Sequence, residues 1–191
     1  MNDNELIHEI LSGKTYLFKD IVEKYRQMVF RTCMGFTHNE EDAGDLTQEV
    51  FINAYQNLKK FKGQSAFSTW LYKIAINASL NFTRKIKKTN VFQRIEMTFG
   101  LDKGKEIPLP ASDIDNPEQI LLNDERRKII KNALGSLTEK QRTALILNKY
   151  DDLSQKEIAG IMNISEGAVE SLMQRAKANL QKKLYHYFIK K

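Results

Sequence analysis

Apolar residues recur three and four positions apart over much of the chain, a spacing that places them on one face of a helix. One such stripe runs from Phe18 to Phe36, and a second follows Asn39, whose side chain and following acids are typical of a helix start. A third helix is predicted from Ser68 to Lys88. Together they predict a compact three-helix bundle. Its expected core residues are Ile21, Val22, Tyr25, Val29, Thr32 and Cys33, then Ala43, Leu46, Val50, Ala54, Leu58 and Phe61, and finally Trp70, Leu71, Ile74, Ala78 and Phe82.

The second half of the chain carries further helix-start signals. Asn116-Pro117-Glu118 combines a cap, a proline at the first helical position and an acid in the first turn, and the helix it opens should end near Gly135. The segment from Thr138 to Gln141 has the form of a capping box, in which two side chains each accept a backbone N–H, so another helix should begin there. The sequence therefore predicts an all-α protein.

A short helix, a tight turn and a longer helix are predicted next. The segment from Ser154 to Glu157 repeats the capping-box form and opens a short helix through Met162. After a turn at residues 163–165, a longer helix is expected from Glu166 to about Leu184. This order of elements is that of a helix-turn-helix. The inward residues of the longer helix should be Val169, Leu172, Ala176 and Leu180.

Charge divides the 191 residues into three parts. The first 90 residues carry 13 basic and 10 acidic side chains, residues 91–122 carry 3 and 6, and the remainder carries 14 and 8, for a net charge of +6. The middle part also holds all three prolines and shows little apolar periodicity. We therefore expect two small helical domains, residues 1–90 and 116–191, joined by an acidic linker over residues 91–115. An ordered excursion of a single domain is the alternative.

The composition disfavours several classes of protein. A single cysteine, Cys33, excludes an intramolecular disulfide, and three widely spaced histidines argue against a histidine metal site, so neither metal nor cofactor is expected. No apolar run approaches the roughly 20 residues that cross a bilayer, and the first five residues do not have the layout of a secretory signal. A cytoplasmic protein without membrane insertion is expected. The basic balance suggests a polyanion as partner.

The last predicted helix has the chemistry to read duplex DNA. Its N-terminal half can lie in the major groove, where Gln174 can pair with adenine and Glu170 can accept from the cytosine amino group. Basic side chains further along would hold phosphates, which sets affinity but not sequence. A plain helical hairpin with solvated charges is the alternative. The candidate DNA contacts are Ser165, Glu166, Glu170, Ser171, Gln174, Arg175 and Lys177.

The second predicted helix carries a polar patch beside its apolar stripe. Asp45, Gln48 and Glu49 are three and four positions apart, so they project from one face. Two carboxylates and an amide can accept charge-assisted hydrogen bonds from arginines of a partner. An ordinary solvated acidic face is the alternative. An acid/base pair is less credible, because no histidine, cysteine or set of metal ligands accompanies these residues.

The third predicted helix presents amides and then a basic tail along one side, a pattern that can read bases while it anchors phosphates. The loop before it, from Lys62 to Ser65, has a glycine for turning and side chains able to bond to a base edge. Tyr72 could stack on a base or serve as a packing residue, whereas Phe67 and Trp70 are expected in the core. A solvated basic face is the alternative. The candidate nucleic-acid contacts are Lys62, Gln64, Ser65, Lys73, Asn77, Asn81, Arg84 and Lys85.

Two parts of the chain resemble a known family. The sequences LSQKEIAGIM at 153–162 and ISEGAVESLMQRAK at 164–177 resemble region 4 of a bacterial sigma factor. The sequences DAGDLTQEVF at 42–51 and FKGQSAFSTWLYKIAIN at 61–77 resemble region 2. Both motifs, in this order and with only a short acidic linker between them, resemble the extracytoplasmic-function (ECF) group of the sigma-70 family.

The resemblance implies a dissociable specificity subunit with no active site of its own. It implies that Asp45, Gln48 and Glu49 bind the clamp helices of the largest catalytic subunit of core RNA polymerase. The loop from Lys62 would capture a base flipped out of the promoter −10 element, the third helix would read the single strand, and the last helix would bind the duplex −35 element. An anti-sigma factor is implied as a further partner. Glu170 and Leu172 stand where many members carry basic residues, so the −35 sequence does not carry over from relatives.

Two other classes of function compete with this interpretation. A stand-alone activator or repressor would use the helix-turn-helix and dimerise through the N-terminal bundle, but the polar face around Asp45 argues against such a dimer. A small helical enzyme acting on nucleic acid would need a nucleophile, a metal set or a glycine loop that grips phosphate, and none of these is evident in the sequence.

Overall fold

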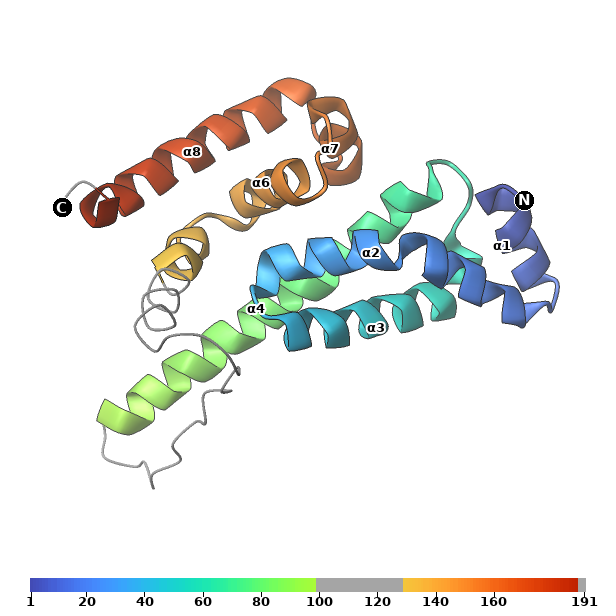
Figure 1. Cartoon of the computed structure of the whole chain (residues 1–191), viewed down its shortest axis with the longest axis horizontal. Helices are drawn as coiled ribbons and strands as arrows, with labels where there is room; N and C mark the ends of the chain where they lie inside the picture. Colours follow the sequence, from blue (N-terminus) through green and yellow to red (C-terminus); the bar gives the residue numbers. More distant parts are fainter. Residues whose placement is uncertain (99–128, 189–191) are drawn as a thin grey trace, which may run out of the picture.

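The computed structural model describes the backbone of residues 1–98 and 129–188, and the side chains of residues 1–89 and 129–185. These parts of the chain are built of helices and connecting turns, which confirms the all-α prediction. Figure 1 shows helices α6, α7 and α8 gathered on one side of the bundle formed by α1 to α4. The principal helices are α1 (Asp3–Leu11), α2 (Phe18–Thr37), α3 (Glu40–Gln56), α4 (Phe67–Thr98), α6 (Glu139–Tyr150), α7 (Gln155–Met162) and α8 (Glu166–Phe188).

The N-terminal bundle has the core that the apolar stripes predict. Helices α2, α3 and α4 pack against one another, and Ile21, Val29, Cys33, Val50 and Leu71 are completely buried at their centre. Phe61, Trp70, Ile74, Ala78 and Phe82 are only partly buried around this core. Burial raises the pKa of the Cys33 thiol, so this residue behaves as an apolar core side chain.

Helix α1 is a feature that the sequence analysis missed. Its N-cap Asn2 accepts the backbone N–H of Glu5, and the Glu5 carboxylate accepts the backbone N–H of Asn2, so the helix opens with a capping box. Leu6, Ile7 and Ile10 then point from one face of α1 into the core of the bundle. The bundle is therefore closed at one end by a fourth helix.

Helices α3 and α4 start close to their predicted positions. The Asn39 side chain accepts the backbone N–H of Asp42 and caps α3, as expected. Helix α3 ends at Gln56, and a short 3₁₀ turn, Leu58–Lys60, leads to the loop before α4. Helix α4 begins at Phe67 but continues to Thr98, well past the predicted end at Lys88, because no proline or glycine interrupts it there.

The C-terminal helices confirm the two predicted capping boxes. Thr138 and Ser154 each accept a backbone N–H three residues ahead, and the side chains of Gln141 and Glu157 return the bond. Asn163 adopts the left-handed conformation at the end of α7, which turns the chain sharply into α8. Residues 129–135 are helical and agree with a helix end near Gly135. The start predicted at residues 116–118 and most of the predicted linker lie outside the described residues.

The two halves of the chain pack directly on each other. Helix α6 lies against α2, and α7 lies against α4. Tyr72 and Ile76 of α4 share a buried cluster with Ile146 of α6 and Ile158 of α7, and Phe36 of α2 belongs to the same cluster. Of the two roles considered for Tyr72, the structure therefore supports packing.

Candidate nucleic-acid interface

Helices α7 and α8 form the predicted helix-turn-helix. Val169 and Ala176 of α8 are completely buried against α6 and α7, while Leu172 and Leu180 pack on the same cluster and remain partly buried. Met173 joins this buried set although the sequence analysis did not select it. The candidate side chains on the opposite face are exposed, namely Ser165, Glu166, Glu170, Gln174, Arg175 and Lys177, and Ser171 is half-buried.

The start of α8 is fixed by local hydrogen bonds. The Ser165 hydroxyl accepts the backbone N–H of Ala168 at 3.2 Å, which holds the first turn in place. One turn further, the Gln174 amide donates to the Glu170 carboxylate at 3.3 Å. These two side chains are therefore held side by side, four residues apart, on the exposed face of α8.

The acidic patch on α3 has the exposure that partner binding requires. Asp45, Gln48 and Glu49 are all exposed, whereas the neighbouring Leu46 and Val50 are buried in the bundle core. Within the described part of the chain, none of these three side chains forms a hydrogen bond or an ion pair with another residue. Their oxygens are consequently available to donors of another molecule.

Helix α4 presents its predicted polar row on the outside. Lys73, Asn77, Asn81, Arg84 and Lys85 are all exposed. The row is not entirely free, because the Arg84 guanidinium donates to both carboxylate oxygens of Glu139 at 2.6 and 2.7 Å, and to the Asn81 amide oxygen at 3.2 Å. These contacts raise the pKa of Arg84, and Arg84 in turn lowers the pKa of the Glu139 carboxyl.

A pocket of about 390 Å³ lies beside the loop that precedes α4. The backbone of Gly63 is in the left-handed conformation with φ +68°, which favours glycine. This conformation turns the loop toward α1. Gly63, Ser65 and Phe67 line one side of the pocket, and Asn2, Asp3 and Asn4 line the other. Lys62 and Gln64 are exposed on the loop but do not line the pocket. Of the three predicted loop residues, only Ser65 therefore contacts this cavity.

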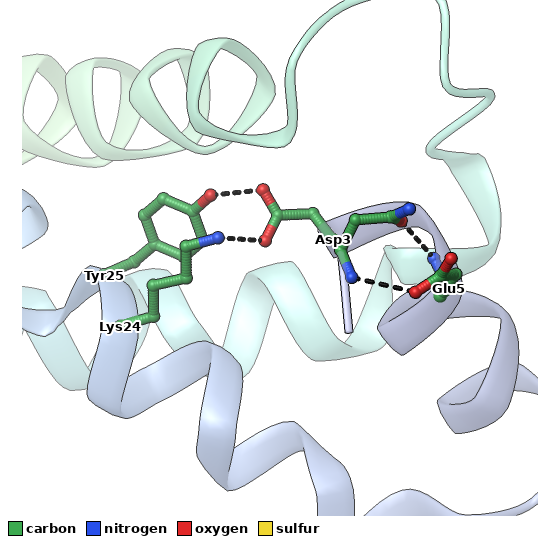
Figure 2. A network of polar contacts seen from close by, with 5 residues as sticks. Asp3, Glu5, Lys24 and Tyr25 are labelled. Atoms are coloured by element: carbon green, nitrogen blue, oxygen red, sulfur yellow. Dashed lines mark hydrogen bonds and ion pairs between the residues drawn. The ribbon is translucent and has the colours of Figure 1, made fainter.

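A polar network fixes the α1 side of this pocket. Lys24 Nζ donates to Asp3 Oδ1 at 2.6 Å, and the Tyr25 hydroxyl donates to Asp3 Oδ2 at 2.5 Å, so both carboxylate oxygens are bound to α2 (Figure 2). Partial burial alone would raise the pKa of Asp3, but the bonds from Lys24 and Tyr25 outweigh it and lower that pKa. The sequence contained a signal for α1, which forms this side of the pocket, because Asn2 to Glu5 has the pattern of a capping box before an apolar run.

The loop side of the pocket rests on an aromatic cluster. The Phe67 ring is buried and lies between Phe61 and Trp70, with ring centroids 5.3 and 5.4 Å away. Tyr25 approaches the same ring at 5.5 Å. This confirms the predicted core role of Phe67, and it holds the start of α4 rigidly beside the loop.

The described residues contain neither a cluster of metal ligands nor a membrane-spanning helix. Among them, no group of three histidine, cysteine, aspartate or glutamate side chains could hold a metal ion. None of the described helices is long and apolar enough to cross a membrane.

Comparison with protein families matches two segments of the chain. Residues 21–89 match the model described as Sigma-70 region 2, and residues 127–180 match Sigma-70, region 4. The first match spans α2 to most of α4, and the second spans α6, α7 and most of α8. They therefore cover the acidic patch on α3, the polar row on α4 and the helix-turn-helix.

Full-length relatives support the same assignment. The chain is 33% identical over 186 residues to the RNA polymerase sigma-H factor of Pseudomonas aeruginosa, covering 95% of this chain and 93% of that protein. It is 34% identical over 180 residues to the ECF RNA polymerase sigma factor SigW of Bacillus subtilis, covering 93% and 94%. It is 33% identical over 188 residues to the ECF RNA polymerase sigma-E factor of Escherichia coli K12, covering 96% and 95%.

Solved structures share the fold. A structure of CnrH in complex with the cytosolic domain of CnrY matches with a TM-score of 0.64 and 22% identity, covering 96% of this chain and 97% of that one. The sigma factor RpoE in complex with the anti-sigma factor NepR from Bartonella quintana matches with a TM-score of 0.54 and 23% identity, covering 88% and 96%. Together with the matches to both sigma-70 regions and the full-length relatives, this shows that the chain belongs to the ECF group of the sigma-70 family of RNA polymerase sigma factors.

Proposed function

We propose that this sigma factor binds core RNA polymerase through α3, reads the −35 element with α8, and captures the separated −10 strand with α4 and the loop before it. The observation that carries the proposal is the adjacency of the exposed polar row on α4 to the pocket at Gly63 and Ser65. Members of this family are transcription initiation factors and not enzymes, so the chain acts by binding alone.

The polar row on α4 suits an unpaired strand. Asn77 and Asn81 offer both donors and acceptors to base edges, which become accessible when the strands separate. Lys73 and Lys85 lie on the same exposed side and can bind phosphates. A strand that follows this row toward the start of α4 arrives at the loop of residues 62–65.

The pocket beside this loop offers space for one flipped base. Ser65 lies on its loop side, and the Asn4 amide lies opposite, with its oxygen 4.0 Å from the position that a Cβ would take at Gly63. Within the described residues the Asn4 side chain makes no hydrogen bond, so its amide can bond to a base edge. Capture of a base here would offset the few kilocalories per mole needed to unstack it, and would thereby favour duplex opening.

The acidic patch on α3 is the proposed contact with core polymerase. Asp45 and Glu49 are exposed carboxylates beside the exposed Gln48, and arginines of a partner helix can bind such a patch in charge-assisted bonds. The family supplies the partner, because sigma factors act as subunits of RNA polymerase. An anti-sigma factor is a further proposed partner, since RpoE of B. quintana, which has this fold, was solved in complex with the anti-sigma factor NepR.

A charge reversal on α3 tests the polymerase contact. The Asp45→Lys variant should lose association with purified core polymerase, because a lysine would face the partner's arginines. Glu23→Lys is the matched control, since Glu23 is an exposed acid on α2, outside the patch, and its reversal should leave association unchanged. Association is measured by fluorescence anisotropy of labelled protein titrated with core polymerase. Equal affinities for the two variants would reject the assignment of this patch.

A further inference from the structure

A short basic turn lies next to the pocket at Gly63. The 3₁₀ turn Leu58–Lys60 carries two exposed lysines, Lys59 and Lys60, which we call the turn lysines. Consecutive Cα atoms are about 3.8 Å apart, so the Cα atom of Lys60 lies within about 11 Å of the Cα atom of Gly63. The turn also contacts α1, and Figure 1 shows the connection between α3 and α4 beside that helix. The turn lysines are therefore close to the pocket proposed to hold a flipped base.

Local bonds and packing hold this turn in one conformation. The backbone N–H of Lys60 donates to the Asn57 carbonyl at 2.8 Å, and that of Phe61 donates to the Leu58 carbonyl at 3.0 Å. Leu58 is buried in the bundle core, and the Phe61 ring packs against the Phe67 ring with centroids 5.3 Å apart. The apolar side chains on either side of the turn lysines thus anchor the backbone. A ligand that binds there does not have to order the turn first.

The charges of the turn lysines are available to a partner. Within the described part of the chain, neither Lys59 nor Lys60 forms an ion pair or a hydrogen bond through its side chain. On the α1 side of the pocket, by contrast, the charge of Lys24 is occupied by Asp3. Two neighbouring unpaired ammonium groups repel each other, and an anion bound to both replaces this repulsion by attraction.

The two sides of the pocket differ in charge. On the α1 side, Asn4 also lines a second hollow of about 520 Å³, together with Glu5 and Glu9. Glu9 is paired with Lys14, but Glu5 has no cationic partner among the described residues. A single strand that left the pocket across α1 would bring its phosphates near these carboxylates. A strand that left along the 3₁₀ turn would instead meet the turn lysines, so electrostatics favours the second path.

We propose that the turn lysines form a phosphate-binding site for the part of the single strand that lies beyond the captured base. The strand then runs along α4, enters the pocket with one base and continues onto the 3₁₀ turn. This proposal rests on the proposed role of α4 and the Gly63 pocket in binding the separated strand. The turn lysines contact the backbone and not the bases, so they increase the affinity for the open strand without selecting its sequence.

The first measurement is the salt dependence of single-strand binding by the full chain assembled with core polymerase. The probe is a fluorescein-labelled oligothymidylate of about 16 nucleotides, and core polymerase alone gives the background. Joint replacement Lys59→Gln and Lys60→Gln should lower the slope of log affinity against log salt by about 1.4, at roughly 0.7 per phosphate contact. Between about 50 and 200 mM salt, the wild type should therefore lose about sevenfold more affinity than this variant.

A second double variant controls for the loss of charge. Lys149→Gln with Lys156→Gln removes two exposed lysines from α6 and α7, which changes the net charge by the same amount. Neither lysine forms an ion pair within the described residues. This control should bind the oligothymidylate with the wild-type salt slope.

The second measurement is a length series, which shows where along the strand the turn lysines act. Affinity should rise over oligothymidylates of about 4 to 16 nucleotides until the strand covers the polar row, the pocket and the turn. Without the turn lysines, nucleotides beyond the pocket find no cation, so the affinity should stop rising at a shorter length. A general loss of positive charge would lower every affinity but leave that length unchanged.

The outcomes separate this proposal from the role of α4. A lower salt slope and a shorter limiting length in the Lys59/Lys60 variant, with wild-type behaviour in the control, support the proposal. It is overturned if both double variants give the same slope or the same limiting length. It is also overturned if the Lys59/Lys60 variant loses association with core polymerase but keeps the wild-type slope, because the turn would then be a protein contact.

Lys73→Gln on α4 tests the parent assignment in the same assay. An unchanged salt slope in Lys73→Gln would count against α4 as the strand-binding helix and would overturn both proposals. A slope that falls by about 0.7 in Lys73→Gln, but stays at the wild-type value in the Lys59/Lys60 variant, would overturn only the site at the turn.

Discussion

The anchoring of α1 by Asp3 yields a prediction that can be worked out from the structure. Asp3→Ala removes the acceptor of both Lys24 Nζ and the Tyr25 hydroxyl, while Leu6, Ile7 and Ile10 keep α1 docked on the bundle. A hydrogen bond to a charged group stabilises a folded protein by about 1.5 to 3 kcal/mol when the bond is shielded from water. The Lys24 side chain is half exposed, so its bond to Asp3 contributes less than this. We therefore expect the free energy of unfolding to fall by about 1 to 2 kcal/mol.

Urea denaturation followed by circular dichroism measures this loss. Glu9→Ala is the matched control, because Glu9 lies on the same helix and forms an exposed ion pair with Lys14 that water screens. Tyr25→Phe removes the hydroxyl alone and should give part of the loss seen in Asp3→Ala. If Asp3→Ala is no more destabilising than Glu9→Ala, the network does not anchor α1.

The same network sets a pH dependence. The pKa of Asp3 is lower in the folded protein than its ordinary value of 3.8, so the stabilisation is complete above that value and is lost as the pH falls through the folded pKa. The difference in stability between wild type and Asp3→Ala should therefore shrink below pH 3.8. A difference that stayed constant down to pH 2 would show that the carboxylate charge is not responsible.

The remaining predictions concern a cap, the recognition helix and the interface between the halves. Ser154→Ala should destabilise by about 1 kcal/mol in thermal unfolding, because α7 loses the hydroxyl that accepts the Glu157 N–H. Gln174→Ala should relax base preference at one −35 position by about 1 to 3 kcal/mol, in binding assays with single-base promoter variants. Burial and the Arg142 charge lower the pKa of His38 from 6.5 to about 4, so stability is complete above pH 6.5 and declines as the pH falls toward 4. His38→Asn, which also tolerates the left-handed backbone, should remove that part of the decline in pH-dependent unfolding; an unchanged profile would contradict this.

Local signals in the sequence predicted the helix starts well. The caps at Asn39, Thr138 and Ser154 depend only on a side chain and a backbone N–H three residues ahead, so a short stretch of sequence specifies each of them. The extension of α4 to Thr98 was missed because the basic residues up to Lys88 were interpreted as the end of the helix, although no proline or glycine follows before Thr98 and Val91, Phe92 and Ile95 keep a helical spacing.

The contacts of the candidate site were less accessible from the sequence. In the sequence, Glu139 is an ordinary acidic residue in the first turn of a capped helix. It becomes the partner of Arg84 only because α6 packs near α4. The pocket wall formed by Asn4 depends on how α1 folds back to the Gly63 loop, about 60 positions away in the sequence. The polar faces were thus predictable from helical spacing, but the residues that oppose them depended on tertiary packing.

The central claim is that this chain directs core RNA polymerase to promoters. Run-off transcription tests it most directly, with purified core polymerase and templates carrying the promoters of the genome that encodes the chain. The account predicts discrete full-length transcripts only when the chain is present, and their loss with the Asp45→Lys variant but not with Glu23→Lys. A transcript pattern that is the same with and without the protein would contradict it.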